Sequence, residues 1–222
     1  MSKIPAFVQL DLLTLRPYYK SVFVLLATGS VFGLMQRDAY VMVAICMVYA
    51  LILVTYPFTI GDKYTLDMLY ATLAIRRSTI VYGRYALVVL LFVLVAICAL
   101  LLTYGMASVL HFPFAWSAMS MLVAVFFVVF ALAAAVQLPI FFKLGYTKAK
   151  LITYVPLVLV PLVVYLFSAF ADTANLKGVS DQVILWTDAH RWLTYGLLVL
   201  AGMTILSISA RISQRLYATR EF

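Results

Sequence analysis

The sequence has few charged residues, and those it has avoid its long apolar runs. Only 11% of its 222 residues are Asp, Glu, Lys or Arg, whereas 66% are hydrophobic. A soluble domain is usually about one-quarter charged and half apolar. The composition therefore indicates a membrane protein, and it leaves no room for a separate soluble domain beside the apolar segments. We expect residues 1–222 to form a single transmembrane domain.

Motifs for enzymatic chemistry are also missing. The sequence contains no G-x-x-x-x-G-K-[ST] phosphate loop, no H-E-x-x-H zinc motif and no G-x-S-x-G nucleophile motif. Its two cysteines lie within apolar runs without metal-ligand spacing. We therefore expect no catalytic residue, metal or bound cofactor in this chain. A membrane hydrolase stays an alternative, in which His111 or His190 would act with Ser117, Ser120 or Asp188.

Ionisable side chains are absent from the middle of every apolar run. Carriers that couple transport to protons or ions usually place such groups at mid-membrane depth. Ion-coupled transport is therefore disfavoured. If the chain lines a transport path, apolar and hydroxyl groups surround the cargo, which favours an apolar or amphiphilic molecule.

Six apolar windows are long enough to cross a bilayer, which needs about 20 residues per helix. The predicted fold is therefore all-α, with six transmembrane helices. The windows are 20–36, 39–58, 83–110, 114–138, 151–171 and 190–210.

The basic residues divide unequally between the two sides of this arrangement. Thirteen of the 16 Lys and Arg residues fall on the side that holds both termini, and three fall on the other. The positive-inside rule then places both termini in the cytoplasm and the protein in the cell membrane. The net charge of +8 is thus a topology signal rather than a nucleic-acid-binding patch. Aromatic residues are expected at the lipid–water boundary of the inner side, among them Phe58, Tyr85, Phe141 and Phe142.

Residues 1–19 precede the first window and show apolar residues at helical spacing. We expect an amphipathic helix in the membrane surface, with Asp11 on its polar side and Pro17 near its end. The alternative is a simple extension of the first span. Within that span, Gly29 and Gly33 form a small-x-x-x-small face, which suits either a second protomer or packing inside one protomer.

The longest inner connection, residues 59–82, carries the most specific pattern. An apolar stripe at helical spacing predicts a short helix with an exposed face, which needs a partner. The stripe consists of Leu66, Leu69, Tyr70 and Leu73. Its partner could also be the bilayer or the N-terminal helix.

This connection resembles the first cytoplasmic loop of ABC-transporter permeases of the ABC-2 exporter type, in their compact six-span branch. The matching residues are Asp62, Lys63, Tyr64, Leu69, Leu73, Ile75, Arg76, Arg77, Ile80, Val81, Arg84 and Tyr85, with Ala74 in place of the usual proline. The second inner connection, 139–150, is similar to the family's loop after the fourth span. Its basic residues are Lys143, Lys148 and Lys150.

The resemblance implies a transport subunit that hydrolyses no ATP itself. Two ABC ATPase subunits, which use ATP and Mg, would dock from the cytoplasm on a coupling helix near residues 62–77. Arg76 and Arg77 would pair there with acidic groups of the ATPase. Two permease protomers would form a homo- or heterodimer that works as an exporter. Lipid, drug and amphiphilic peptide are all possible cargoes, and we prefer an amphiphilic or antimicrobial peptide because the spans lack charged side chains. The alternative from another class is a membrane scaffold or immunity protein without an ATPase.

Overall fold

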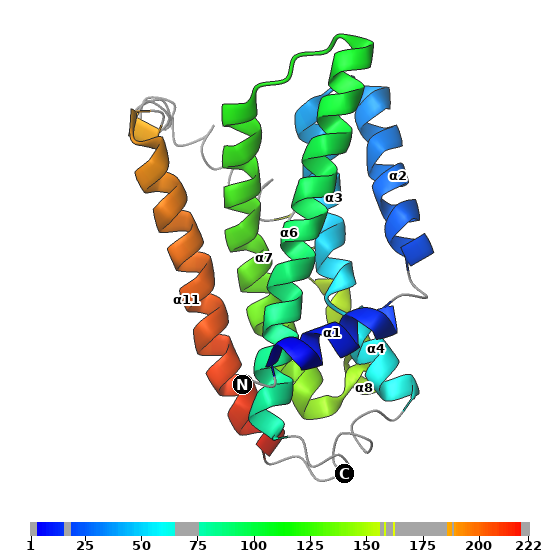
Figure 1. The fold of residues 1–222 in the computed structure, drawn as a ribbon, viewed down its shortest axis with the longest axis vertical. Coiled ribbons are helices and arrows are strands. Elements are labelled where there is room, and N and C mark those ends of the chain that lie inside the picture. The colour runs from blue at the N-terminus through cyan, green and yellow to red at the C-terminus, as the bar shows by residue number, and fades with distance from the viewer. Residues whose placement is uncertain are drawn as a thin grey trace.

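A computed structural model describes residues 4–15, 19–64, 76–155, 158, 162, 186–187 and 189–218, and all its regular elements are helices. Figure 1 shows them as one bundle with a short helix across its lower end. In chain order they are α1 (Ile4–Leu15), α2 (Tyr19–Gln36), α3 (Ala39–Leu53), α4 (Tyr56–Lys63), α6 (Arg77–Leu110), α7 (Trp116–Leu144), α8 (Tyr146–Ala149), the 3-10 helix η2 (Lys150–Thr153) and α11 (Arg191–Ala218).

Four stretches of helix are long and apolar enough to cross a membrane. They are Ala39–Lys63, Arg77–Leu110, Trp116–Leu144 and Arg191–Ala218, and they correspond to the second, third, fourth and sixth predicted spans. The first predicted span is the shorter apolar helix α2. Most of the fifth, 151–171, lies outside the described residues. The all-helical membrane fold is confirmed, whereas the count of six spans stays a prediction.

From α2 to α7 the long helices run alternately up and down, and α11 runs in the same direction as α7 (Figure 1). Short connections join α2 to α3 and α6 to α7 at the upper end. Arg37 connects α2 to α3 in a left-handed conformation (φ 51°), and the Asp38 side chain caps α3 by accepting from the Tyr40 N–H at 2.7 Å. His111 ends α6 in the same conformation (φ 59°). These two turns fall between the first and second and between the third and fourth predicted windows.

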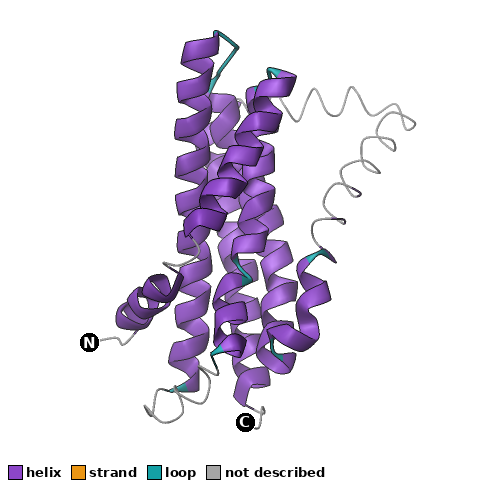
Figure 2. Ribbon diagram, turned by 90° about the vertical axis from the view of Figure 1, so that its right-hand side faces the viewer, coloured by secondary structure: helices purple, strands orange, loops and turns teal. Residues whose placement is uncertain are grey.

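The opposite end carries α1, α4, α8, the start of α6 and the end of α11 (Figures 1 and 2). We call it the basic end, because most of the described Lys and Arg side chains belong to it. They are Lys63, Arg76, Arg77, Arg84, Lys143, Lys148, Lys150, Arg211 and Arg215.

Small residues bring the helices together in the core. A side chain at Gly33 would place its Cβ 2.4 Å from the Cβ of Met42 on α3, and one at Gly29 would lie 2.8 Å from Cys46 Sγ. At Gly202 on α11, an added Cβ would lie 2.5 Å from the Phe127 ring on α7. Gly29 and Gly33 thus serve packing inside the protomer. The outer faces of the helices expose leucines, valines and phenylalanines, as lipid contact requires.

Helix α7 continues past Pro139, where the sequence predicted the end of the fourth span. Proline cannot donate a backbone hydrogen bond to the carbonyl four residues earlier. That carbonyl belongs to Ala135, and it accepts a hydrogen bond of 2.9 Å from the Ser209 hydroxyl on α11. A neighbouring helix therefore satisfies the carbonyl, and α7 runs on to Leu144. The two predicted inner connections, 59–82 and 139–150, are correspondingly shorter, because α4, α6 and α7 extend into them.

Candidate functional site

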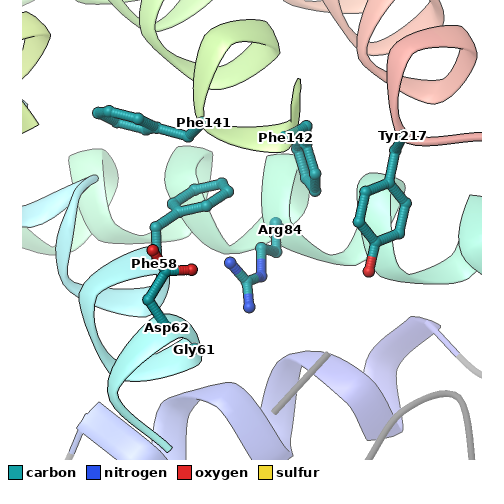
Figure 3. A pocket seen from close by; sticks show the side chains of 7 residues that line it. All are labelled: Phe58, Gly61, Asp62, Arg84, Phe141, Phe142 and Tyr217. Carbon is teal, nitrogen blue, oxygen red and sulfur yellow. The ribbon is translucent and has the colours of Figure 1, made fainter. Parts of the chain in front are cut away.

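A buried arginine lies at the centre of the basic end. Arg84, two turns into α6, is only 3% exposed, and its guanidinium carbon lies 4.4 Å from the centre of the Phe58 ring on α4. Figure 3 shows the side chain pointing from α6 toward α4. Gly61 makes this approach feasible, because an added Cβ there would lie 3.0 Å from Arg84 Nη2. The arginine thus makes a cation–π contact with Phe58, beside a glycine whose missing side chain leaves room for the guanidinium group.

Aromatic rings enclose this arginine. Phe58 contacts Phe141 and Phe142 of α7 at centroid distances of 5.3 and 5.1 Å, and Phe142 contacts Tyr217 of α11 at 5.3 Å. With Gly61, Asp62 and Arg84 these rings line a cavity of about 10 Å³ (Figure 3). The prediction of an aromatic belt at the lipid boundary was wrong for Phe58, Phe141, Phe142 and Tyr85. They are buried because they pack around the Arg84 side chain and against α11.

Helix α1 joins the cluster through an ion pair. A carboxylate oxygen of Asp11 lies 3.8 Å from Arg84 Nε, and Asp11 is 2% exposed. The expected orientation of α1 was therefore wrong, since Asp11 points into the protein while Leu12 and Leu13 point outward. A buried carboxylate needs a partner, and Arg84 supplies one. The helix crosses the lower end of the bundle as an element separate from α2 (Figure 1), and its place in the membrane surface stays a prediction.

Asp62 joins the two inner connections. Its Oδ2 accepts hydrogen bonds from the backbone N–H and the hydroxyl of Thr147, at 2.8 and 3.1 Å. Thr147 lies in the first turn of α8, where N–H groups lack partners within the helix. A carboxylate from α4 thus caps a helix 85 positions further along the chain.

Arg77 ties the start of α6 to the end of α11. Its Nη1 donates to the carbonyl oxygens of Tyr217 and Ala218, the former at 3.2 Å. A cation is favoured at a helix C-terminus, where carbonyls lack partners within the helix. Eight residues further along α6, the Tyr85 hydroxyl lies 2.7 Å from that of Ser209 and 2.8 Å from that of Ser213. Helices α6 and α11 are therefore joined by polar contacts over two turns.

The predicted coupling residues fall into three groups. Asp62 and Arg77 bind other parts of the same chain, as described above. Lys63 lies over the Tyr64 ring at 5.4 Å, and Arg76 is exposed at the start of α6. Leu66, Leu69, Tyr70 and Leu73 lie outside the described residues.

The basic residues of the second connection are all on the surface. Lys143, Lys148 and Lys150 are exposed around α8 and η2, beside exposed Leu144 and Leu151. Helix α8 itself lies against α4, where Asp62 holds it.

The alternative of a hydrolase finds no support in the described geometry. His111 Nδ1 lies 3.1 Å from the Val109 carbonyl, and His190 stacks on Trp186. Ser120 lies 2.8 Å from the hydroxyl of Tyr195. Asp188 lies outside the described residues. Among the residues that the structure describes, no group of three His, Cys, Asp or Glu could hold a metal ion.

The arrangement joins helices to one another and contains no group placed for catalysis among the described residues. One buried cation contacts α1 and α4 from its place on α6, and polar contacts continue to α8 and α11. Asp11 and Arg84 were not singled out as a site from the sequence. The sequence contains two hints of a buried pair, an acid within an apolar helix and a base at the start of a span. Their pairing across 73 positions is not visible in one sequence.

Comparisons with known proteins give one finding. A family model described as "ABC-2 family transporter protein" matches residues 7–218, nearly the whole chain. No curated protein and no solved structure matches it.

Proposed function

The chain belongs to the ABC-2 transporter family, and from this premise we propose that it is the permease subunit of an ATP-driven exporter. Two copies of an ABC ATPase, using ATP and Mg, dock on its basic end from the cytoplasm. Two permease protomers form the transport path through the cell membrane, with both termini of each in the cytoplasm. The cargo is apolar or amphiphilic, such as an amphipathic peptide, because no charged side chain lies in the middle of a described span.

The observation that carries the proposal is the anchoring of the segment between α4 and α6. At its first end, α4 is fixed by Phe58 against α7 and by Asp62 against α8. At its second end, Arg77 is fixed to α11. An ATPase that moves this segment would act on α7 and α8 through α4 and on α11 through α6, which suits a coupling element.

Binding to the ATPase depends mainly on the apolar stripe of Leu66, Leu69, Tyr70 and Leu73. Exposed ion pairs contribute only about 0–1 kcal/mol each. We expect Leu69→Asp to uncouple ATP hydrolysis from export more strongly than Arg76→Ala does. Arg76 is the suitable comparison because it is exposed and lies beside Arg77, which has a structural contact. Equal or reversed effects would count against docking through the stripe.

The experiment to perform first is purification of the tagged chain from native membranes in mild detergent, followed by an ATPase assay of the eluate. A co-purifying P-loop ATPase, lost on Leu69→Asp and kept on Arg76→Ala, supports the proposal. A pure chain without an ATPase indicates the scaffold or immunity role instead.

A further inference from the structure

The buried ion pair at the basic end has a position that stability alone does not explain. Replacing a buried ion pair by apolar residues is often neutral or stabilising, so such a pair is weak support for a purely structural role. Arg84 is also too deeply buried to touch an ATPase from outside. Its contacts all lead to other helices of the same chain.

The two helices that flank the segment between α4 and α6 meet at the Arg84 side chain. On the α4 side, Gly61 and Phe58 lie directly against the guanidinium group. On the α6 side, Arg84 follows Arg77 by seven residues, which is two helical turns and the same face of the helix. A displacement of α4 relative to the start of α6 therefore changes the surroundings of Arg84.

The guanidinium group of Arg84 is closely packed. The adjoining cavity of about 10 Å³ has space for about one water molecule at most. A Cβ at position 61 would lie only 3.0 Å from Arg84 Nη2, so α4 passes close to the planar guanidinium group. A shift of α4 along α6 therefore displaces the guanidinium group, whose Nε lies 3.8 Å from the Asp11 carboxylate.

We propose that Arg84 is the positioning residue that transmits movement of the segment between α4 and α6 to α1, with the Asp11–Arg84 ion pair as the link. This rests on the proposed function, in which the ATPase moves that segment. Helix α1 then follows each ATP cycle and moves its exposed leucines relative to the bundle, in step with the transport path. The consequence is that α1 is a moving part of the transporter and not a passive anchor.

Hydrogen exchange measured by mass spectrometry on the purified permease–ATPase complex tests this link. Exchange is compared between the nucleotide-free state and the state trapped with ATP and vanadate. In the wild type we expect the trapped state to alter exchange in residues 65–75 and in α1. In Asp11→Asn, which keeps the volume and leaves Arg84 against Phe58, residues 65–75 still respond while the response of α1 is lost.

Two further variants make the result decisive. Arg84→Gln should lose the α1 response as Asp11→Asn does, and Arg215→Gln, which removes an exposed arginine at the same end, should keep it. Because loss of a buried guanidinium can impair assembly, Asp11→Asn carries the decision. A variant that only loosens the structure raises exchange of α1 in both states and leaves the difference between them.

Three results would overturn the inference. An α1 response in Asp11→Asn equal to that of the wild type removes the ion pair as the link. A complex in which residues 65–75 respond but α1 does not, already in the wild type, removes α1 as a moving part. Absence of any co-purifying ATPase overturns the proposed function itself, and the inference falls with it.

Discussion

Gly33 shows how one residue can set the distance between two helices. An added methyl group would lie 2.4 Å from Met42 Cβ and 3.0 Å from Met42 Cα, so α2 would have to move away from α3. Backbone atoms cannot yield as the end of a flexible side chain can. The close approach of the two helices therefore depends on the missing side chain.

We expect Gly33→Ala to destabilise the protein by about 1–3 kcal/mol, the usual cost of overpacking a core. Thermal unfolding of the purified chain in detergent, followed by circular dichroism, measures the effect. Gly105→Ala is the matched control, because an added Cβ there meets no atom within 4 Å. If both variants unfold at the same temperature, the described contact between α2 and α3 is incorrect.

The Tyr85 hydroxyl is the centre of a polar chain between three helices. Ser209 donates its proton to the Ala135 carbonyl, so Tyr85 must donate to Ser209 and accept from Ser213. The hydroxyl is buried, and it joins α6 to the place where Pro139 leaves a carbonyl of α7 without its usual partner. Loss of this group affects two hydrogen bonds at once.

Tyr85→Phe should lower the free energy of unfolding by about 1 kcal/mol, since hydrogen bonds between membrane helices contribute about 0.6 kcal/mol each. Unfolding in mixed detergent micelles measures it. Tyr82→Phe serves as the comparison, because Tyr82 is partly exposed and makes one hydrogen bond of 3.1 Å to Gln214. A smaller loss for Tyr85→Phe than for Tyr82→Phe would argue against the buried chain.

At the scale of single elements, the sequence predicted the long helices well and their ends less well. Hydrophobicity places α6, α7 and α11, because lipid contact demands a long apolar surface. It misplaced the end of α7, since proline usually ends a helix and the compensating Ser209 lies on another helix. It also shortened α6 and α11, whose ends at the basic side carry charged residues that hydropathy excludes.

The candidate site was predictable only in part, for a related reason. The loop pattern singled out Asp62 and Arg77, but as contacts for an ATPase rather than as contacts to α8 and α11. Helical spacing likewise put Asp11 on a polar side, because a pattern on one helix contains no information on its partner. Tertiary pairing of charges across 73 residues needs the folded chain.

At the scale of the whole molecule, the basic end is the part with structure beyond a simple bundle. Helices α1, α4 and α8 all gather there, and the connections that the structure describes at the far end are the turn at Arg37 and the one after His111 (Figure 1). Loops that face a cytoplasmic partner are expected to hold both the positive charge and the additional elements.

Membrane orientation is tested by cysteine labelling of intact cells with an impermeant maleimide. In a Cys98→Ser background, which removes the exposed native cysteine, Gln36→Cys at the far end should react and Lys150→Cys at the basic end should not. Opening the cells should make Lys150→Cys reactive. The reverse pattern would place the termini outside and would rule out docking of a cytoplasmic ATPase on the basic end.

Helix α6 has 34 residues, so its length is about 51 Å, well above the roughly 30 Å thickness of the hydrocarbon core. Arg84 lies seven residues from its start, or about 10 Å along the axis. With the excess length at this end, we expect Arg84 and Asp11 to sit at the depth of the lipid headgroups rather than in the hydrocarbon core. In a thicker bilayer the Asp11–Arg84 pair would lie closer to the hydrocarbon core. The thickness of the host membrane would then affect how strongly α1 is bound to α6.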